Sequence, residues 1–378
     1  PDDMAALVIS RLLALHRAIE PGNLTDVILG CANQAGEDNR NVARMALLLA
    51  GLPITVPGIT VNRLCASGMS ATAMAASAVR AGEGTLYVTG GVESMTRAPY
   101  VVSKGGTPWA RDAHLFDTSI GWRFVNPRLQ QLYGVDSMGQ TAENVAERHR
   151  VSREDQDRLA AWSQQKAAAA RANGRLAEEI TPVTSPGAKG ATVDFAQDEF
   201  IKPETTPEIL AKLRPAFRSD GQGSVTAGNS SGINDGACAL LVASEREVDR
   251  LRLPALARIV ASAAVGVEPR LMGMGPVPAT QRVLELAGLT LDQVDVIEIN
   301  EAFAAQSLAC LRELGIADDD PRVNRNGGAI ALGHPLGMSG ARLVLTAARE
   351  LQRSRGRYAL CTMCVGVGQG TAMIIEAT

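Results

Sequence analysis

The sequence predicts an α/β fold that consists of two similar halves and one insertion. Three observations support this prediction. Short apolar runs that fit strands alternate with stretches of helical periodicity at both ends of the chain. The 378 residues, 46% of them hydrophobic, are enough for two cores or one large layered core. Aromatic residues make up only 3% while Ala and Gly are abundant, so helices and sheets are expected to pack closely through small side chains.

The first half comprises residues 1–116 together with residues 221–245, and it alternates between helices and strands. Gly51 and Pro53 end one predicted helix, and Gly82 ends the next. The expected helices cover residues 4–18, 42–50 and 67–81, and the expected strands cover residues 27–31, 59–64, 86–92 and 237–243. This alternation predicts a mostly parallel sheet with helices on both faces.

Residues 117–220 form the predicted insertion, because the pattern there becomes polar and irregular with several Pro and Gly residues. One strong charged helix is expected at residues 153–173, with Ser152 as its N-cap. The second α/β half comprises residues 246–378. Its expected helices cover residues 281–287, 302–314 and 339–353, and its expected strands cover residues 294–299, 358–364 and 372–376.

The two halves also resemble each other locally, which favours an internal duplication. The tripeptide Val-Asn-Arg occurs at residues 61–63 and again at residues 323–325. Gly-Met-Ser follows at residues 68–70 and 337–339, close to the start of a predicted helix in both cases.

Charge and cysteine usage exclude several classes of protein. The net charge is −3 and the basic residues are scattered, so neither nucleic acid nor a membrane is an expected partner. No run of about 18 apolar residues occurs, and the start at Pro1 has no signal-peptide pattern. The six cysteines are mostly far apart, which differs from a disulfide scaffold and indicates a reducing compartment such as the cytoplasm. A small-molecule substrate is expected.

Cys65 is the first candidate for chemistry, because it lies where a predicted strand gives way to a helix. Its sulfur would face the N–H groups of the first helical turn, which lower the pKa of a thiol. Taken alone, the position fits a buried structural cysteine better.

His334 is one of only four histidines, and it ends a stretch, residues 326–335, that contains several glycines. Glycine permits close backbone approach to a ligand, so this setting favours a catalytic histidine over a structural one. A third turn places Asn300 at the end of another predicted strand. Active sites of α/β proteins assemble at such strand ends.

Cys361 and Cys364 form a CxxC pair that suggests a redox pair or half of a zinc site. There is no second CxxC, and residues three apart in a strand face opposite sides, so no metal site is expected. The glycines that follow resemble a dinucleotide-binding loop, but only one short strand remains before the last residue, whereas that loop must open a long helix.

Six stretches in the same order resemble the thiolase family, and together they extend over nearly the whole chain. They are residues 61–69, 90–95, 226–232, 300–303, 333–335 and 364–366. The resemblance implies a duplicated five-layer αβαβα fold with an inserted loop domain. It also implies that Cys65 is the acylated nucleophile, that Cys364 is the proton-transferring base, and that His334 and Asn300 lie against the reacting carbonyl. The backbone N–H of Gly366 is expected in the oxyanion hole.

The same resemblance implies coenzyme A as co-substrate, no prosthetic group, no metal and a homotetramer. By position, the family's coenzyme A contacts fall on Met138, Lys202, Phe217, Ala227, Ser231 and Met272. Residues 30–44, 121–124 and 133–138 look like the 3-oxoadipyl-CoA thiolases of bacterial aromatic degradation. Arg123 is then the candidate partner for the free carboxylate of that substrate.

Three other functions are alternatives to the cleavage of 3-oxoadipyl-CoA. Cleavage of acetoacetyl-CoA or of other 3-oxoacyl-CoA molecules is the alternative within the family. A decarboxylating condensing enzyme would have a similar fold, but it has no use for Cys364 as a base. A non-catalytic acyl-CoA or lipid carrier would not need Cys65, His334 and Asn300 together.

Overall fold

The first sheet lies in the N-terminal half and has four strands in the order β2-β1-β3-β8. In this computed structural model, which describes residues 1–187 and 191–378, β1 pairs in parallel with both β2 and β3, while β8 runs antiparallel to β3. The strands are β1 (Asp26–Gly30), β2 (Gly58–Val61), β3 (Leu86–Ser94) and β8 (Asp235–Ala243). Because β8 comes about 140 residues after β3, the sheet closes only after the intervening segment.

The second sheet has the order β10-β11-β12-β9 and is mixed. Its strands are β9 (Ala257–Gly266), β10 (Val296–Ile299), β11 (Tyr358–Val365) and β12 (Gln369–Ala377). Only β10 and β11 are parallel, whereas β12 runs antiparallel to both β11 and β9. The mostly parallel sheet that was predicted for the first half is confirmed there, whereas the second sheet is mainly antiparallel and β11 returns into β12 through a tight turn at residues 366–368.

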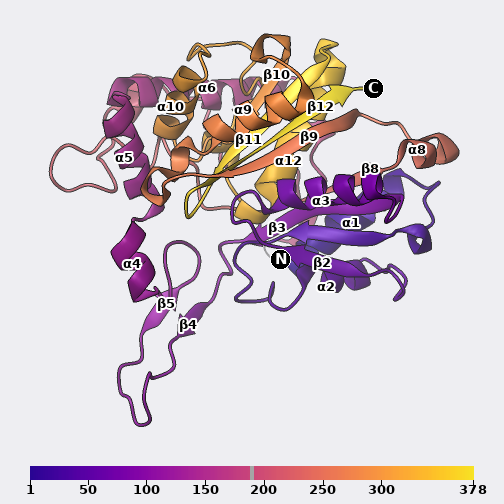
Figure 1. Cartoon of the computed structure of the whole chain (residues 1–378), viewed down its shortest axis with the longest axis horizontal. Coiled ribbons are helices and arrows are strands. Elements are labelled where there is room, and N and C mark those ends of the chain that lie inside the picture. Colours follow the sequence, from indigo (N-terminus) through magenta and orange to yellow (C-terminus); the bar gives the residue numbers. More distant parts are fainter. Residues whose placement is uncertain (188–190) are drawn as a thin grey trace.

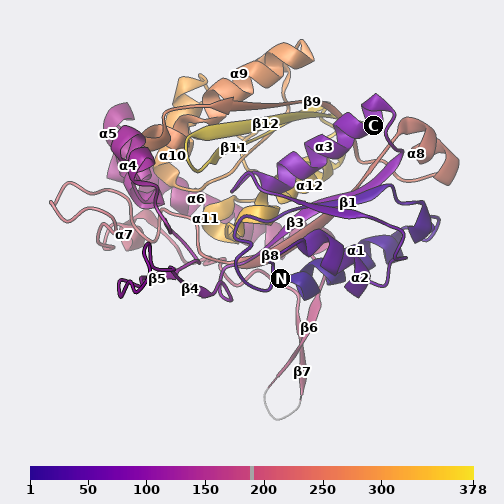
Figure 2. The same ribbon diagram turned by 60° about the horizontal axis from the view of Figure 1, so that its bottom comes forward.

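Helices outside and between the two sheets complete five layers, as the fold class predicted (Figures 1 and 2). One outer layer holds α1 (Asp2–Leu15) and α2 (Val42–Leu49), and the other holds α9 (Pro276–Ala287) and α10 (Ala304–Glu313). The central layer holds α3 (Ser67–Ala81) and α12 (Leu336–Ser354). Side chains of α12 pack against β10 and β11 in one core cluster, and both central helices also contact β3.

The central helices touch the first sheet backbone to backbone. A Cβ at Gly91 of β3 would lie 2.1 Å from the carbonyl oxygen of Gly337, the second residue of α12. A Cβ at Gly337 would lie 2.4 Å from the oxygen of Val92, and one at Gly68 of α3 would lie 2.8 Å from the oxygen of Gly337. Only glycine fits these positions, which confirms the prediction of close packing through small residues.

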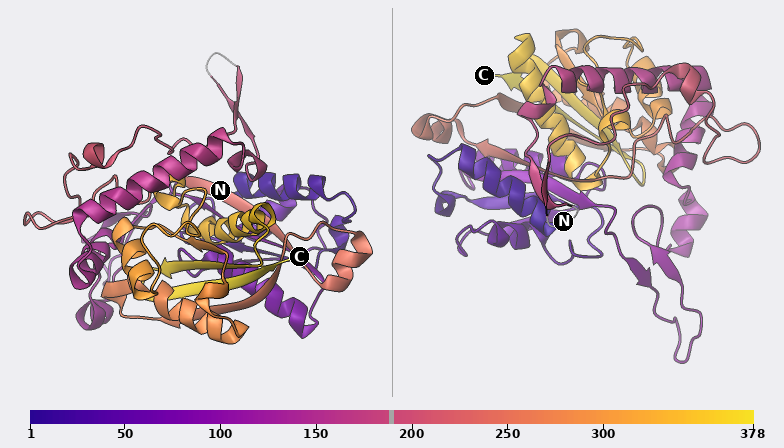
Figure 3. Two further views of the ribbon diagram at one scale, coloured as in Figure 1. Left: turned by 90° about the horizontal axis from the view of Figure 1, so that it is seen from above. Right: turned by 180° about the vertical axis from the view of Figure 1, so that it is seen from behind.

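The segment between β3 and β8 has more regular structure than predicted. It contains two hairpins, β4 (Tyr100–Val102) with β5 (Leu115–Asp117) and β6 (Val183–Pro186) with β7 (Thr192–Phe195). Both hairpins project from the body (Figures 1 and 2). Its helices are α4 (Pro127–Tyr133), α5 (Met138–His149), α6 (Arg153–Ala172) and α7 (Pro207–Leu210). The long α6 lies against the C-terminal half (Figure 3).

Short elements connect these layers. They are η1 (Pro21–Asn23), η2 (Leu176–Glu178), α8 (Glu245–Leu251), η4 (Pro269–Met274), η5 (Leu291–Gln293) and α11 (Ala329–Leu332). Among the helices that the structure describes, none combines the length and apolar character needed to cross a bilayer. All six cysteines are free thiols.

The glycine contacts give a stability prediction. We expect Gly337→Ala to lower the free energy of unfolding by about 3 kcal/mol, because the new methyl group would overlap the backbone of β3. The matched control is Gly22→Ala, where the nearest atom to an added Cβ is 3.9 Å away. Urea unfolding of both variants measures the difference. Equal stability of the two variants would contradict the packing constraint.

Candidate active site

Cys65 lies in the turn between β2 and α3. Leu64 has a left-handed φ of 47°, and the side chain of Asn62 holds this strained turn by accepting the N–H of Leu64 at 2.8 Å. The turn presents the sulfur of Cys65 to two backbone donors, the N–H of Gly366 and the N–H of Cys65 itself. The structure therefore brings Cys65 and Gly366 together, although 301 residues separate them in the sequence.

The prediction of a lowered pKa for Cys65 is wrong. Burial raises the pKa of this thiol to about 11, and the two backbone N–H donors offset only part of that rise. The nearby carboxylate of Glu93 adds to the rise. Cys65 is thus a neutral thiol near pH 7, and the role of nucleophile would require a neighbouring base to take its proton.

His334 lies between α11 and α12 and is held through both ring nitrogens. Its Nδ1 is 2.7 Å from the Oγ of Ser339, whose hydroxyl donates to the carbonyl oxygen of Pro335 at 3.0 Å. Since that hydroxyl has one proton, Nδ1 carries a hydrogen and donates it to Ser339. Nε2 is then the free nitrogen, and it accepts from the Nδ2 of Asn300 at 3.3 Å.

Burial makes His334 a neutral imidazole. Burial first, and the positive charge of Arg342 second, lower the pKa of the imidazole from 6.5 to about 3. Asn300 is fully buried, and within the described residues its Oδ1 has no hydrogen-bond partner. His334 and Asn300 therefore offer one basic nitrogen, Nε2, and one acceptor without a partner, Oδ1, in a buried region.

Cys364 faces away from Cys361, as their spacing in β11 predicted. Cys361 packs in the core beside α12, whereas Cys364 belongs to a separate cluster with Met272, Ala302 and Phe303. Burial raises the pKa of Cys364 well above its usual range, and the proximity of Cys65 raises it further. Two neutral thiols thus lie near each other at the end of β11.

The residues assigned to coenzyme A are only partly brought together. Met138 and Met272 line the same cluster as Cys364. The ring of Phe217 makes an edge-to-face contact with Phe303 at 6.3 Å, which places it at the border of that cluster. Ser231 donates its N–H to the oxygen of Ala302 at 3.0 Å.

Ala227 and Lys202 lie on the exposed side. Ala227 is exposed in the loop that precedes Ser231. Lys202 is exposed, with its ammonium 5.2 Å from the ring centre of Phe200, and Phe200 packs against Gly232. No contact places Lys202 in the cluster around Cys364, so its role as a phosphate partner stays a prediction.

Arg123 is a half-buried cation whose guanidinium binds neutral oxygens. Its Nη2 donates to the main-chain oxygen of Asn33 at 3.1 Å and to the side-chain oxygen of Asn33 at 2.9 Å. Within residues 1–187 and 191–378, no carboxylate forms an ion pair with it. Its assignment to a substrate carboxylate also stays a prediction.

Three positioning side chains were not singled out from the sequence. Ser339 orients His334, and Asn234 accepts the backbone N–H of His334 at 3.3 Å. Glu301 accepts from Ser163 at 2.6 Å and from Asn324 at 2.7 Å, and Gly328 fits against its carboxylate because a Cβ there would lie 2.1 Å away. The glycines near His334 were a signal for such contacts, but not for their partners.

The carboxylate of Glu93 holds the start of α12 through a backbone hydrogen bond. Its carboxylate accepts the N–H groups of Ala32 and Asn33, both at 3.0 Å, and of Gly337 at 2.8 Å. A carboxylate at a helix N-terminus is stabilised by the helix dipole. Cys31, Asp38 and Glu93 place three ligand-type atoms within 4.8 Å of one another, but the Glu93 oxygens are engaged by these N–H donors.

The sequence matches two family descriptions in order. "Thiolase, N-terminal domain" matches residues 1–246, and "Thiolase, C-terminal domain" matches residues 253–377. The chain belongs to the thiolase family. This confirms the resemblance that the six sequence stretches indicated, and it makes the chain an acyltransferase.

Several characterised thiolases are similar over nearly their full length. The "3-oxoadipyl-CoA/3-oxo-5,6-dehydrosuberyl-CoA thiolase" of Escherichia coli is 60% identical over 99% of this chain and 93% of its own length. A "beta-ketoadipyl-CoA thiolase" of Acinetobacter baylyi is 59% identical with the same coverage. The crystal structure of the Bacillus anthracis acetyl-CoA acetyltransferase superposes with a TM-score of 0.91 at 38% identity, covering 100% of this chain and 93% of that one.

The neutral His334 gives this thiolase a specific pH dependence of stability. Its pKa is lowered from 6.5 to about 3 in the folded state, so only the unfolded chain gains a proton between those values. The stability contributed by His334 is complete above pH 6.5 and falls as the pH drops. We expect a loss of about 2 kcal/mol between pH 7.5 and pH 5 that His334→Asn does not show.

Urea unfolding at the two pH values measures this difference. The comparison of wild type with His334→Asn cancels the contributions of other titrating groups. An identical pH response of both proteins would contradict a buried neutral imidazole.

Proposed function

We propose that this thiolase cleaves 3-oxoadipyl-CoA with coenzyme A to acetyl-CoA and succinyl-CoA. One observation carries the chemistry: the sulfur of Cys65 lies against the N–H of Gly366 and close to Cys364. The 60% and 59% identities to thiolases named for this substrate support the choice of acyl group. The acetyl-CoA acetyltransferase of known structure is less similar, at 38%.

In the first half-reaction, the sulfur of Cys65 attacks the C3 carbonyl carbon, and its proton passes to Nε2 of His334. The resulting oxyanion accepts from the imidazolium N–H and from a water on Asn300, or from the N–H groups of Cys65 and Gly366. Removal of one such donor typically costs roughly 100-fold to 1000-fold in rate. The C2–C3 bond then breaks, and Cys364 gives its proton to the leaving acetyl-CoA enolate.

In the second half-reaction, the Cys364 thiolate takes the thiol proton of coenzyme A. The coenzyme A sulfur attacks the thioester on Cys65, and succinyl-CoA leaves as the Cys65 sulfur recovers its proton from His334. A covalent intermediate of this kind gives ping-pong kinetics. Coenzyme A is a co-substrate in this scheme, and side chains and backbone N–H groups fill every chemical role without a prosthetic group or metal.

The contacts proposed for coenzyme A fit an extended thioester ligand. Met138 and Met272 supply an apolar slot beside Cys364, Phe217 lies at its border, and the loop with Ala227 and Ser231 runs past the same turn. Lys202 is proposed as the cation near the phosphates. The enzyme is assigned to the cytoplasm, because catalysis requires Cys65 to remain a free thiol.

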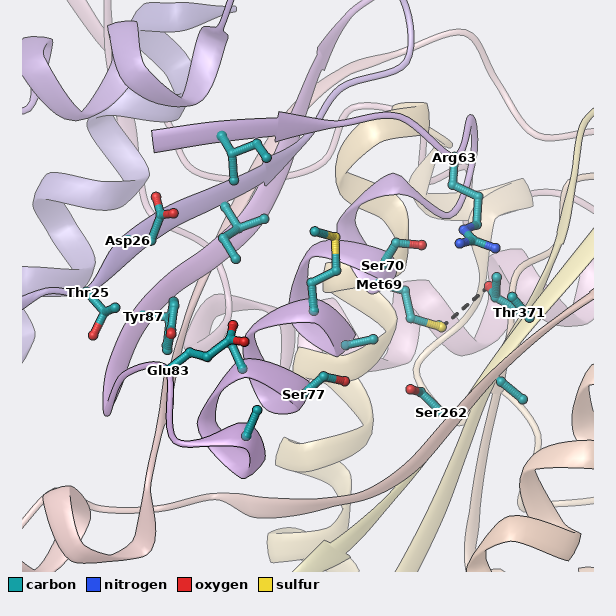
Figure 4. A pocket seen from close by; sticks show the side chains of 18 of the residues that line it. Thr25, Asp26, Arg63, Met69, Ser70, Ser77, Glu83, Tyr87, Ser262 and Thr371 are labelled. Carbon is teal, nitrogen blue, oxygen red and sulfur yellow. Dashed lines mark hydrogen bonds between the residues drawn. The ribbon is translucent and has the colours of Figure 1, made fainter. Parts of the chain in front are cut away.

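A homotetramer is also proposed, and two exposed surfaces support it. The strand β2 ends the first sheet, and its free side adjoins a groove of about 670 Å³ lined by Ile59, Met74 and residues of β9 and β12 (Figure 4). The β4–β5 hairpin carries further exposed apolar side chains such as Trp109. Open edges and apolar patches of this kind favour association. A single-chain mass in light scattering would refute the proposal.

The decisive test compares three substrates. We expect kcat/KM for 3-oxoadipyl-CoA to exceed that for acetoacetyl-CoA and for a medium-chain 3-oxoacyl-CoA, and Cys65→Ser to lower it by roughly 1000-fold or more. Cys238→Ser, a buried thiol on β8, is the matched control and should keep full activity. Mass spectrometry should detect a succinyl adduct on Cys65 when coenzyme A is omitted.

A preference for acetoacetyl-CoA would support the proposed thiolase chemistry but refute 3-oxoadipyl-CoA as the substrate. Full activity of Cys65→Ser would refute the role of Cys65 as the nucleophile. No cleavage of any substrate would favour a condensing enzyme or an acyl-CoA carrier.

Arg123 gives a prediction about substrate choice. If its guanidinium pairs with the terminal carboxylate, Arg123→Met should lower kcat/KM for 3-oxoadipyl-CoA about 100-fold, while acetoacetyl-CoA, which lacks that carboxylate, should change less than about threefold. Arg270→Met is the control, since Arg270 already pairs with Asp136 at 2.9 Å. Equal losses on both substrates would remove Arg123 from this role.

A further inference from the structure

A buried contact between a carboxyl group and a guanidinium connects β10, which Asn300 follows, to α12, which His334 precedes. Glu298 is fully buried in β10, and its Oε2 is 3.6 Å from Nη1 of Arg342 in α12. Neither carboxylate oxygen of Glu298 has a hydrogen-bond partner within residues 1–187 and 191–378, and the same holds for both Nη atoms of Arg342. Buried polar atoms without hydrogen bonds are costly for a merely structural contact, and Arg342 also acts through its charge on Glu179 and Asp198.

The strand geometry places this pair beside the catalytic pair. Asn300 directly follows β10 and its N–H still donates to the oxygen of Thr362 in β11, so the side chains of Glu298 and Asn300, two residues apart, leave the same face. Val296, on that face as well, packs in the core cluster with Leu343 of α12, whereas Ile297 and Ile299 pack on the opposite side with α10. The face with Glu298 and Asn300 is therefore the face toward α12.

Two polar contacts thus join β10 and the residue after it to α12 and the loop before it, Glu298 with Arg342 at 3.6 Å and Asn300 with His334 at 3.3 Å. Arg342 also acts on His334 through its charge, since it lowers the pKa of the imidazole. Burial raises the pKa of Glu298 to about 8, so Glu298 gains or loses its charge near neutral pH. This ionisation changes the net charge that acts on His334.

Other titratable groups surround the pair from several elements. The charges that act on the pKa of Glu298 are those of Arg342, Glu179, Glu301 and Glu350. The charge of Glu298 in turn acts on Lys166 and Cys361. Arg342 is the one cation among the groups that lower the pKa of Glu298. It is therefore the dominant partner.

We propose that Glu298 and Arg342 are positioning residues for acyl transfer, which hold His334 in register with Asn300. The inference rests on the proposed function of His334 and Asn300 and extends it to a pair that touches no substrate. Neither residue donates or accepts a proton in the reaction.

The kinetic test uses Glu298→Gln, Arg342→Met and the double variant. We expect the single variants to lower kcat for thiolysis about 10-fold and about 100-fold, respectively, with KM for the acyl-CoA within about twofold. The double variant should resemble Arg342→Met, because the two residues act as one unit. Arg342→Lys keeps the charge and should recover part of the loss. Glu247→Gln, in the ion pair with Arg250 on α8, is the control and should keep kcat.

A spectroscopic test separates positioning from general stability. In protein labelled with carbon-13 at the histidine ring, the signal of His334, assigned with His334→Asn, should shift with a midpoint near pH 8 as Glu298 ionises. Glu298→Gln should abolish that step, and Arg342→Met should raise the pKa of His334. Altered melting temperatures with unchanged kcat and unchanged His334 titration would overturn the inference.

The two proposals fail in different ways. An inactive wild type would refute the proposed function. An active wild type that requires His334 but tolerates loss of Glu298 and Arg342 would refute this inference alone.

Discussion

The close approach of α12 to β3 and α3 is the constraint on which the rest of the structure depends. Gly91, Gly68 and Gly337 let backbones meet where any side chain would intervene, and Glu93 ties the first turn of α12 to the end of the first sheet. This contact brings the loops before α3 and α12 to the same place. Because Cys65 lies in one loop and His334 in the other, packing in the central layer rather than a flexible segment positions the proposed nucleophile and the proposed catalytic histidine.

The electrostatics of the site follow from the same packing. Burial favours the neutral forms of both thiols and of the imidazole, so Cys65 and His334 do not form an ion pair in the resting state. The hydrogen bonds from Asn300 to His334, and on to Ser339 and Pro335, all run in one direction and leave Nε2 as the ring nitrogen without a proton. Charge then develops only during the reaction, in a region where fixed donors act strongly because water is scarce.

The sequence predicted those features that local patterns determine. The bounds of α3 were predicted correctly because Gly82 ends its periodicity, and the opposite orientations of Cys361 and Cys364 follow from strand geometry alone. The strand β9 was missed because its burial does not alternate, and α5 was missed because polar residues interrupt its apolar face. The pKa of Cys65 was predicted with the wrong sign, since the sequence shows the helix that would lower it but not the depth of burial. Ser339 and Asn234 act through contacts in three dimensions that no spacing reveals.

The position of α12 near the end of the chain has a consequence for synthesis. Its side chains complete the cover of β3 and β8, yet the ribosome makes β3 about 240 residues earlier. The inner face of the first sheet and the apolar side of α3 therefore stay uncovered until α12 has been made. Domains of most proteins fold as they emerge from the ribosome. In this chain the N-terminal half must remain without aggregating until α12 can pack against it. Small, alanine-rich surfaces expose less apolar area than large side chains would, so the composition that permits tight packing also protects the nascent chain.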